Sequence, residues 1–162
     1  MRVLITTLLL VQLAGCGGTD AIPTATGTTC ASPDPMTFGY TAADTPGCTG
    51  TPDQCNFGKT FMDAYCINCH ASAIPLSKRN GAPLYHDFDT LLGVMEVVGH
   101  IDEQAGFGPN AQNEFMPGDG TGGKCPSVAG GSLDSSCPAI SADERTNLAQ
   151  WLACEKDRPH SF

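Results

Sequence analysis

The chain has 162 residues, with 17 acidic and 8 basic side chains and a formal net charge of −9 at pH 7. This length allows one modest hydrophobic core. Because such an acidic chain cannot neutralise a phosphate backbone, its composition excludes nucleic-acid binding. The same charge favours protein partners with basic docking surfaces, mainly because it speeds their encounter.

The N-terminus has the layout of an export signal. Arg2 precedes a mostly apolar stretch over residues 3–13, which is shorter than the roughly 20 residues of a membrane-spanning helix. Leu-Ala-Gly-Cys follows at residues 13–16 and resembles the lipobox of bacterial lipoproteins. That resemblance implies removal of residues 1–15 as a signal peptide and lipid attachment at Cys16. An ordinary secretory signal with a coincidental cysteine is the alternative.

The residues after the cysteine predict a location and a tether. In bacterial lipoproteins an Asp at this position favours the inner membrane, so Gly17 favours the outer membrane, with the protein facing the periplasm. Residues 16–53 are rich in Thr, Pro, Gly, Ala and Asp and predict an extended tether. This tether either stands free or lies partly against the domain, which is predicted over residues 54–159.

Nine cysteines are the most informative feature of the composition. Cys16 is assigned to lipid, and Cys66 and Cys69 belong to the motif described next. An even number then remains, as a set of disulfides in an oxidising compartment requires. The sequence leaves the pairing open. Cys30 is expected to pair with Cys48, unless the tether lies partly against the domain, and Cys125 with Cys137, which is close to it in sequence. Cys55 precedes the first predicted helix of the domain and Cys154 ends the last, so a Cys55–Cys154 bond would tie these two helices together.

Cys66-Ile67-Asn68-Cys69-His70 has the spacing of a c-type haem attachment site. Two thiols separated by two residues on a helical turn can reach the two vinyl groups on one side of a porphyrin. The adjoining His70 is then placed to bind the iron as proximal ligand. The motif occurs once, so the sequence predicts one covalently attached haem c.

Two other kinds of site share the Cys-x-x-Cys spacing. A thiol–disulfide oxidoreductase carries it at a helix start, usually in a βαβ setting, and no strand-like run precedes Cys66. A zinc site needs a second ligand pair at close spacing, whereas the other cysteines are scattered along the chain. The sequence therefore favours haem over both alternatives.

The residues before the motif resemble the first helix of class I cytochromes c. Gly58 and Phe61 stand at the offset where that family has a glycine and an aromatic residue. Phe57, Phe61 and Tyr65 recur every four residues and form one face of a helix predicted over residues 57–69. The resemblance implies an all-α fold, a small cytochrome c-like domain of three or more helices around one haem, with long loops and disulfides.

A closing helix is predicted at the other end of the domain. Ser141 and Glu144 have the spacing of a capping box at its start. The helix that follows resembles the last helix of class I cytochromes c, which lies across the first. The resemblance places Trp151 opposite Gly58 and Phe61.

The sixth iron ligand is expected between these helices. A middle helix is predicted over residues 87–98, and no clear strand or long helix is predicted over residues 99–140. Met116 is followed by Pro117 in this long loop and matches the axial Met of the resembled family. His100 is the alternative distal ligand and would give bis-His ligation. The other rivals are His86, Met95 and Met62.

Two more residues are expected beside the haem. Gly-Ala-Pro-Leu around Pro83 resembles a turn of the same family, whose proline carbonyl accepts the second N–H of the proximal histidine. Pro75 is the alternative acceptor for His70, because an extra alanine interrupts the pattern. Arg79 or Lys78 is expected to pair with a haem propionate, the alternative being that both are simply solvated.

Electron transfer is the predicted function, because a Met and a His would fill both axial positions of the iron. The chain is therefore not expected to be an enzyme, although it is compatible with a subunit of a larger oxidoreductase. One alternative is a peroxidase-like haem enzyme with His100 on an open distal side. Another is a haem-free, disulfide-rich surface lipoprotein in which Cys66 and Cys69 pair with each other.

Overall fold

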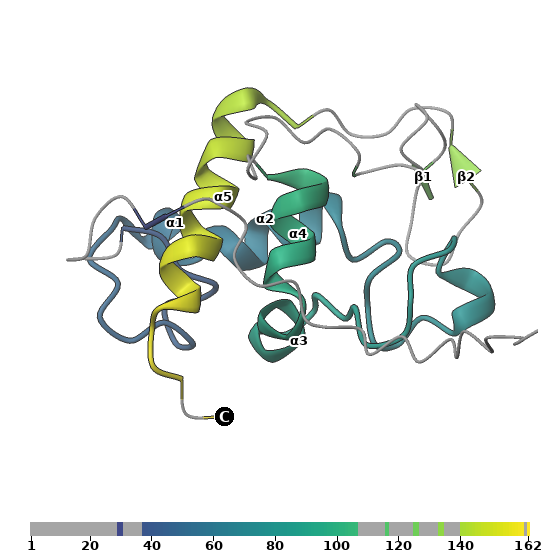
Figure 1. Ribbon diagram of the computed structural model, residues 1–162, viewed down its shortest axis with the longest axis horizontal. Helices are drawn as coiled ribbons and strands as arrows, with labels where there is room; N and C mark the ends of the chain where they lie inside the picture. The colour runs from purple at the N-terminus through teal and green to yellow at the C-terminus, as the bar shows by residue number, and fades with distance from the viewer. Residues whose placement is uncertain are drawn as a thin grey trace, which may run out of the picture.

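The computed structural model describes residues 29–30, 37–106, 116, 125–126, 133–134, 140–160 and 162. In this part of the chain the only strands, β1 (Cys125–Pro126) and β2 (Leu133–Asp134), form a short antiparallel ladder, and all other regular structure is helical. The predicted all-α class is confirmed at this level (Figure 1). Every helix among the described residues is too short or too polar to cross a membrane.

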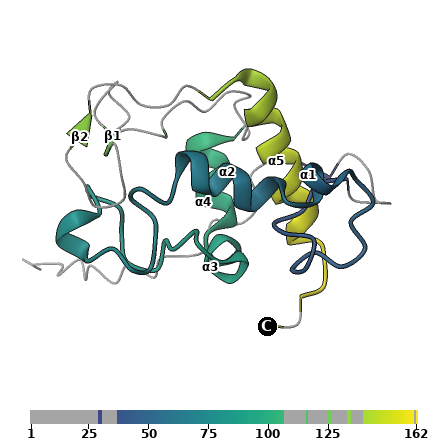
Figure 2. The same cartoon turned by 180° about the vertical axis from the view of Figure 1, so that it is seen from behind.

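Two of the described helices, one near each end of the domain, cross in the middle of the molecule (Figure 1). The described helices are α1 (Pro52–Cys55), α2 (Phe57–Tyr65), the 3-10 helix η1 (Leu76–Lys78), α3 (Leu91–Glu96), α4 (Val98–Ala105) and α5 (Ala142–Lys156). α5 crosses α2, and α4 packs beside α5 (Figures 1 and 2). The chain between α2 and α3, with η1, forms the end of the molecule opposite α1 (Figures 1 and 2).

Two of the predicted helices are shorter than expected. α2 ends at Tyr65, before the Cys-x-x-Cys-His motif, whose residues form turns instead. The middle helix predicted over residues 87–98 begins only at Leu91. The backbone N–H of Phe88 donates to the carbonyl oxygen of His70 at 2.7 Å, and Phe88 and Asp89 form a turn before α3 begins.

A second helix replaces the end of the predicted middle helix. α3 ends at Glu96, because the next residue, Val97, has a φ of −132° that is not helical. α4 begins directly after it, at Val98. α4 extends into the stretch for which no long helix was predicted. The sequence did not reveal this helix, because Gly99 and His100 near its start weaken the apolar periodicity there. The resulting kinked pair packs against α5 through α4.

The crossing of the first and last helices is confirmed. Ser141 and Glu144 form the predicted capping box of α5, with Ser141 Oγ accepting from the Glu144 N–H at 3.2 Å. Trp151 of α5 is fully buried, and its indole ring lies directly over Gly58 of α2. A Cβ atom added at Gly58 would lie only 2.8 Å from Cε2 of Trp151, so only glycine allows this approach.

The hydrophobic core also includes a segment that was assigned to the tether. Tyr40 is 3% exposed, its ring stacks 6.1 Å from that of Trp151, and its hydroxyl donates to the Phe88 carbonyl at 3.2 Å. The backbone N–H of Lys59 donates to the Tyr40 carbonyl at 2.9 Å. Residues 37–53 therefore belong to the domain, which begins earlier than the predicted residue 54.

The described disulfides differ from the predicted pairs. Cys30 is bonded to Cys154, with Cα atoms 4.6 Å apart, and Cys48 is bonded to Cys55, with Cα atoms 5.7 Å apart. The predicted pairs Cys30–Cys48 and Cys55–Cys154 are wrong, because the packed segment around Tyr40 returns Cys48 to the start of the helices. The two remaining cysteines are not tested: Cys137 lies outside the described residues, as does the side chain of Cys125.

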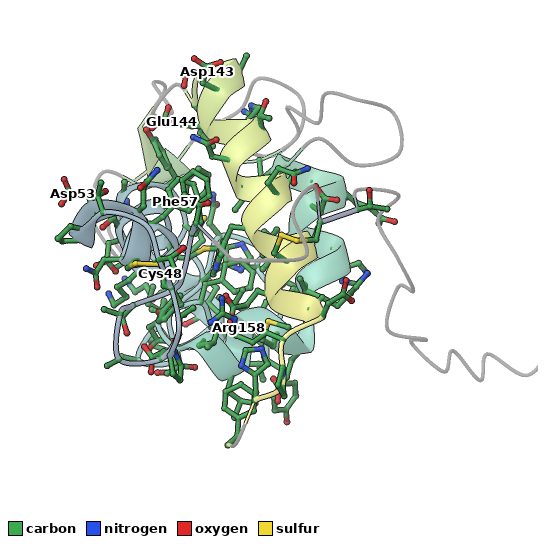
Figure 3. The ribbon with its side chains drawn as sticks, turned by 90° about the vertical axis from the view of Figure 1, so that its left-hand side faces the viewer. Cys48, Asp53, Phe57, Asp143, Glu144 and Arg158 are labelled. Carbon is green, nitrogen blue, oxygen red and sulfur yellow. A yellow bond between two sulfur atoms is a disulfide. The ribbon has the colours of Figure 1, made fainter. Side chains whose placement is uncertain are left out.

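The two disulfides reinforce one end of the molecule. Figure 3 shows α5 running from Asp143 and Glu144 down to Arg158, beside the segment that carries Cys48. The Cys30–Cys154 bond spans 124 residues of sequence and ties the start of the described chain to the last helix. A bond that closes so long a loop stabilises a fold by about 2–4 kcal/mol, chiefly by restricting the unfolded chain.

Gly58→Ala tests the helix crossing. The added methyl group collides with Trp151, whose indole N–H is fixed by a 3.0 Å hydrogen bond to the Glu155 carboxylate. Overpacking should exceed the gain in helix propensity, and we expect a net loss of about 1–2 kcal/mol in the free energy of unfolding by urea. Thr60→Ala, on the exposed side of the same helix, is the control and should change stability by less than about 0.7 kcal/mol. An equally stable Gly58→Ala protein would contradict the described crossing.

Glu155→Gln tests a buried carboxyl group at the end of α5. Burial raises the pKa of Glu155 above its ordinary value, and the charge of Arg158 opposes this in part. Because the folded-state pKa is the higher one, the native state loses stability as the pH rises from 4.5 through that raised pKa. We expect Glu155→Gln to show a smaller loss of stability as the pH rises above 4.5. Asp157→Asn, which removes an exposed carboxylate, should keep the wild-type slope.

Candidate haem site

The two thiols of the motif are unpaired and lie where α2 ends. The backbone N–H groups of Cys66 and Ile67 both donate to the Met62 carbonyl, at 2.9 and 3.0 Å, and this shared acceptor closes the helix. The N–H groups of Cys69 and His70 then both donate to the Cys66 carbonyl, at 3.1 and 3.0 Å. The chain thus turns tightly through the motif. Cys66 and Cys69 are the free cysteines among the described residues, where every other cysteine with a described side chain is in a disulfide.

Both thiols are held in their neutral form. Burial, with a smaller contribution from Cys69, raises the pKa of Cys66 to about 12. Burial also raises the pKa of Cys69, although a hydrogen bond with Asn80 acts in the opposite direction. A thiol–disulfide oxidoreductase needs a thiol whose pKa is lowered. The environment of this pair therefore disfavours that alternative.

His70 is fixed in orientation by the segment that precedes α3. Its Nδ1 lies 3.1 Å from the carbonyl oxygen of His86, and its ring stacks on Phe88 with centroids 4.4 Å apart and planes at 9°. A carbonyl acceptor places the proton on Nδ1 and leaves the Nε2 lone pair free, and among the described residues nothing hydrogen-bonds Nε2. Burial lowers the pKa of His70 to about 4. The imidazole is therefore neutral and oriented, as a metal ligand must be.

The acceptor for His70 is a correction to the prediction. Neither Pro83 nor Pro75 receives its N–H, because the carbonyl of His86 takes that position. The carbonyl of Pro83 accepts instead from Nη1 of Arg79, at 2.9 Å. The predicted kind of interaction is present, but it comes from a residue closer to α3.

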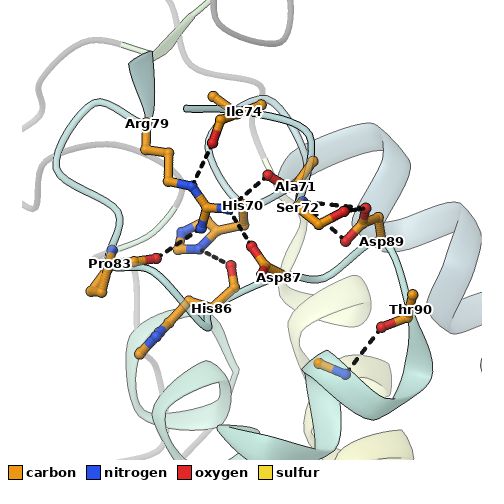
Figure 4. A network of polar contacts seen from close by, with 11 residues as sticks. His70, Ala71, Ser72, Ile74, Arg79, Pro83, His86, Asp87, Asp89 and Thr90 are labelled. Carbon is orange, nitrogen blue, oxygen red and sulfur yellow. Dashed lines mark hydrogen bonds and ion pairs between the residues drawn. The ribbon is translucent and has the colours of Figure 1, made fainter. Parts of the chain in front are cut away.

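Arg79 has a structural position rather than the predicted one beside a propionate. It is 1% exposed, and its guanidinium donates to the carbonyls of Ile74, Pro83 and Ala71, each at 2.9 Å. The same group forms an ion pair with Asp87 (Figure 4). Through these bonds the buried guanidinium of Arg79 holds together the loop that follows the motif. Lys78, the other candidate, is exposed.

Met116 is held at the junction of α4 and α5. Its N–H donates to the Gln104 carbonyl at 2.8 Å, and its own carbonyl accepts from Nη1 of Arg145 at 3.2 Å. Arg145 is buried and also donates to the Ala105 carbonyl at 2.7 Å. The Met116 side chain packs against the same hydrophobic core as Cys66. The long loop therefore returns Met116 to the core that supports the motif.

The rival ligand His100 belongs to a row of histidines. Its ring stacks on that of His86, with centroids 5.7 Å apart and planes at 18°, and His86 in turn lies 6.3 Å from the ring of His70. Burial lowers the pKa of His86, and its Nδ1 is buried without a hydrogen-bond partner in the described part of the chain. The ring of His100 is thus stacked on His86, whereas Met116 packs on the core. The other rivals, Met62 and Met95, contribute to the hydrophobic core.

The zinc alternative needs further ligands. Among the described residues there is no group of three or more His, Cys, Asp and Glu side chains that could hold a metal ion. Cys66, Cys69 and His70 instead provide two attachment points and one axial nitrogen, which are the donors a covalently bound haem requires. On the chemistry of these donors, the residues present fit haem.

No protein-family model, curated protein or solved structure matches the chain significantly.

Several residues of the site were not foreseen from the sequence. The sequence predicts His86 only as a rival iron ligand, and it assigns no role in the site to Phe88, Asp87 or Arg145. His86 supplies a backbone carbonyl and Phe88 a stacked ring. Asp87 pairs with the buried Arg79, and Arg145 is itself a buried arginine that donates to the Met116 carbonyl. Partners for Arg79 and Arg145 can be expected only once these arginines are known to be buried, because a buried charge requires a partner.

Arg79→Met tests the loop that carries the site. The substitution leaves Asp87 without its ion-pair partner and three carbonyls without their donor. We expect a loss of about 3–5 kcal/mol in the free energy of unfolding, measured by urea titration. Lys78→Met removes the neighbouring exposed cation and should change stability by about 0.5 kcal/mol or less. Equal effects of the two substitutions would contradict the network.

Proposed function

We propose that this chain is an electron-transfer protein that holds one haem c covalently through Cys66 and Cys69, with His70 as the proximal iron ligand. One observation carries the proposal. Two unpaired thiols occupy one tight turn, and the next residue is a neutral histidine whose Nδ1 is fixed by a backbone carbonyl. The haem-free alternative expects a bond between Cys66 and Cys69, and their free thiols argue against it.

The residues of the chain have separate tasks in this proposal. Haem, when bound, supplies a one-electron couple between ferric and ferrous iron. The two cysteines anchor it, and His70 presents Nε2 while the His86 carbonyl keeps the ring in place and makes it a stronger donor. Phe88 restricts rotation of the His70 ring by stacking on it. We propose a carrier rather than an enzyme, because the tasks of these residues are to hold and orient the haem.

Met116 is the proposed distal ligand, and His100 is the alternative. A thioether is soft and neutral, so it favours ferrous iron and raises the reduction potential. The anchoring of the Met116 backbone by Gln104 and Arg145 supports this assignment, because a weak ligand must be held in place by its surroundings. The stacking of His100 on His86 supports a separate position for that ring.

The chain is further proposed to act outside the cytoplasm as a lipoprotein anchored at Cys16. The two described disulfides support this location, since such bonds persist in oxidising compartments. We propose the periplasmic face of the outer membrane, and redox partners with basic docking surfaces. The net charge of −9 supports the choice of partner.

Cys66→Ser/Cys69→Ser tests haem attachment. Produced with the haem-attachment machinery, the wild-type protein should carry one covalent haem in the pyridine-haemochrome assay, and the double variant none, because serine cannot form the thioether. Cys48→Ser/Cys55→Ser removes a disulfide at the opposite end of the molecule and should keep covalent haem. A colourless wild-type protein would remove the proposal and leave the haem-free lipoprotein.

Met116→Ala tests the distal ligand. The ferric wild-type protein should show a Met–iron charge-transfer band in the near infrared, which Met116→Ala should lose and His100→Ala should keep. If His100→Ala changes the spectrum and Met116→Ala does not, the distal ligand is His100. High-spin ferric iron in the resting wild-type protein would favour the peroxidase-like alternative.

A further inference from the structure

Tyr65, the last residue of α2, is hydrogen-bonded to a carboxylate of the other crossing helix. Its hydroxyl donates to Oε1 of Glu144 at 2.8 Å, and both side chains are half-buried. The second oxygen of Glu144 accepts from the backbone N–H and from the hydroxyl of Ser141, at 2.9 and 2.8 Å. The capping box of α5 therefore fixes the carboxylate, while one of its oxygens stays on the phenol of Tyr65.

The pair consists of a neutral phenol and an ionised carboxylate. Hydrogen bonds from Ser141, and a further one from Tyr65, lower the pKa of Glu144, so this group is ionised at neutral pH. The hydrogen bond to Glu144, together with burial, raises the pKa of Tyr65, so the phenol keeps its proton. A base at hydrogen-bond distance can take a proton as soon as the donor becomes acidic.

The other two tyrosines of the chain have different surroundings. The hydroxyl of Tyr40 donates to the Phe88 carbonyl at 3.2 Å, and an amide oxygen is a very weak base. Tyr85 is 77% exposed, where water is the available proton acceptor. Tyr65 is thus the tyrosine for which the described part of the chain shows a hydrogen bond to a carboxylate.

A phenol that loses one electron becomes strongly acidic, so a tyrosine is oxidised readily only when its proton has an acceptor. Tyr65 also has a suitable position, because it directly precedes Cys66 of the motif. Its ring lies 4.9 Å from that of Phe61, and contacts of 5.8 and 6.2 Å continue through Phe57 to Trp151. Electron transfer weakens steeply with distance, so rings in contact favour it.

We propose that Tyr65 is a redox-active tyrosine, which gives one electron to a strong one-electron oxidant and its phenol proton to Glu144. The oxidant is reduced by one electron, and the phenol O–H bond breaks. A neutral phenoxyl radical remains on Tyr65, and Oε1 of Glu144 gains the proton. This step needs no haem, so the inference goes beyond the proposed function. Beside Cys66, Tyr65 can serve as the electron donor when such an oxidant arises at the motif.

The test oxidises the full chain with photo-generated trivalent tris-bipyridine ruthenium, which is a strong one-electron oxidant. The chain is used as purified, with any bound haem in the ferric state. The tyrosyl radical is followed by transient absorption and identified by electron paramagnetic resonance. Tyr65→Phe should abolish the fast phase of radical formation that the wild-type protein shows. Tyr85→Phe, which removes an exposed phenol, should keep that phase.

Glu144→Gln tests the proton acceptor. Glutamine has the size of glutamate, can accept the hydrogen bond from Tyr65 and is compatible with the capping box, but it is not a base. We expect the fast phase to be about a hundredfold slower, at the lower end of what a positioned base contributes. Asp143→Asn removes an exposed carboxylate of the same helix turn and so matches the change in attraction for the cationic ruthenium complex. Its rate should stay within about twofold of the wild type.

Equal fast phases in the wild type and Tyr65→Phe would overturn the proposal. It is also overturned if Glu144→Gln forms the radical as fast as the wild type, since the hydrogen bond then serves only the helix crossing. Urea unfolding of each variant separates a change of fold from a change of chemistry. Haem content is measured on every sample, and a chain without haem would refute the proposed function while leaving the test of Tyr65 intact.

Discussion

The candidate site depends on one local arrangement, the attachment of His70 to residues 86–88. The His86 carbonyl accepts a hydrogen bond from Nδ1 of His70, and the Phe88 ring stacks on the imidazole. The backbone N–H of Phe88 donates to the carbonyl of His70. Together these contacts fix both the backbone and the ring of one residue, which immediately follows two free thiols. The loop between 70 and 86 must close for this to happen. Arg79 provides that closure, because a buried cation can gather several carbonyls and Asp87 at once.

The crossing of α2 and α5 supports this arrangement from the other side. Gly58 lets the helices approach until the indole of Trp151 touches the α2 backbone, and Tyr40 stacks on the same indole. The hydroxyl of Tyr65, at the end of α2, donates to Glu144 at the start of α5 at 2.8 Å. The motif thus begins at a point where both helices are fixed. The described disulfides stabilise the opposite end of the molecule, so they lie away from the candidate haem site (Figure 1).

The sequence predicted the parts of the fold that follow from local patterns. The capping box at Ser141 and the aromatic face of α2 have short-range signatures, and both are present. The contact of Trp151 with Gly58 is also present, but it joins distant segments and was implied by the family resemblance. Disulfide pairing was mispredicted because it depends on where distant segments meet, and residues 37–53 had no apolar periodicity to reveal the burial of Tyr40. The partners of His70 and Arg79 were missed for a related reason. Their acceptors are backbone carbonyls, and any residue type can supply one.

Mass spectrometry of the peptide that contains residues 66–70 tests the central claim most directly. The protein is produced with a competent haem-attachment machinery and digested without reduction. The account predicts a peptide whose mass is increased by one haem, with both Cys66 and Cys69 protected from thiol-alkylating reagents. A peptide with two alkylated thiols, or with a Cys66–Cys69 disulfide and no haem, would contradict it.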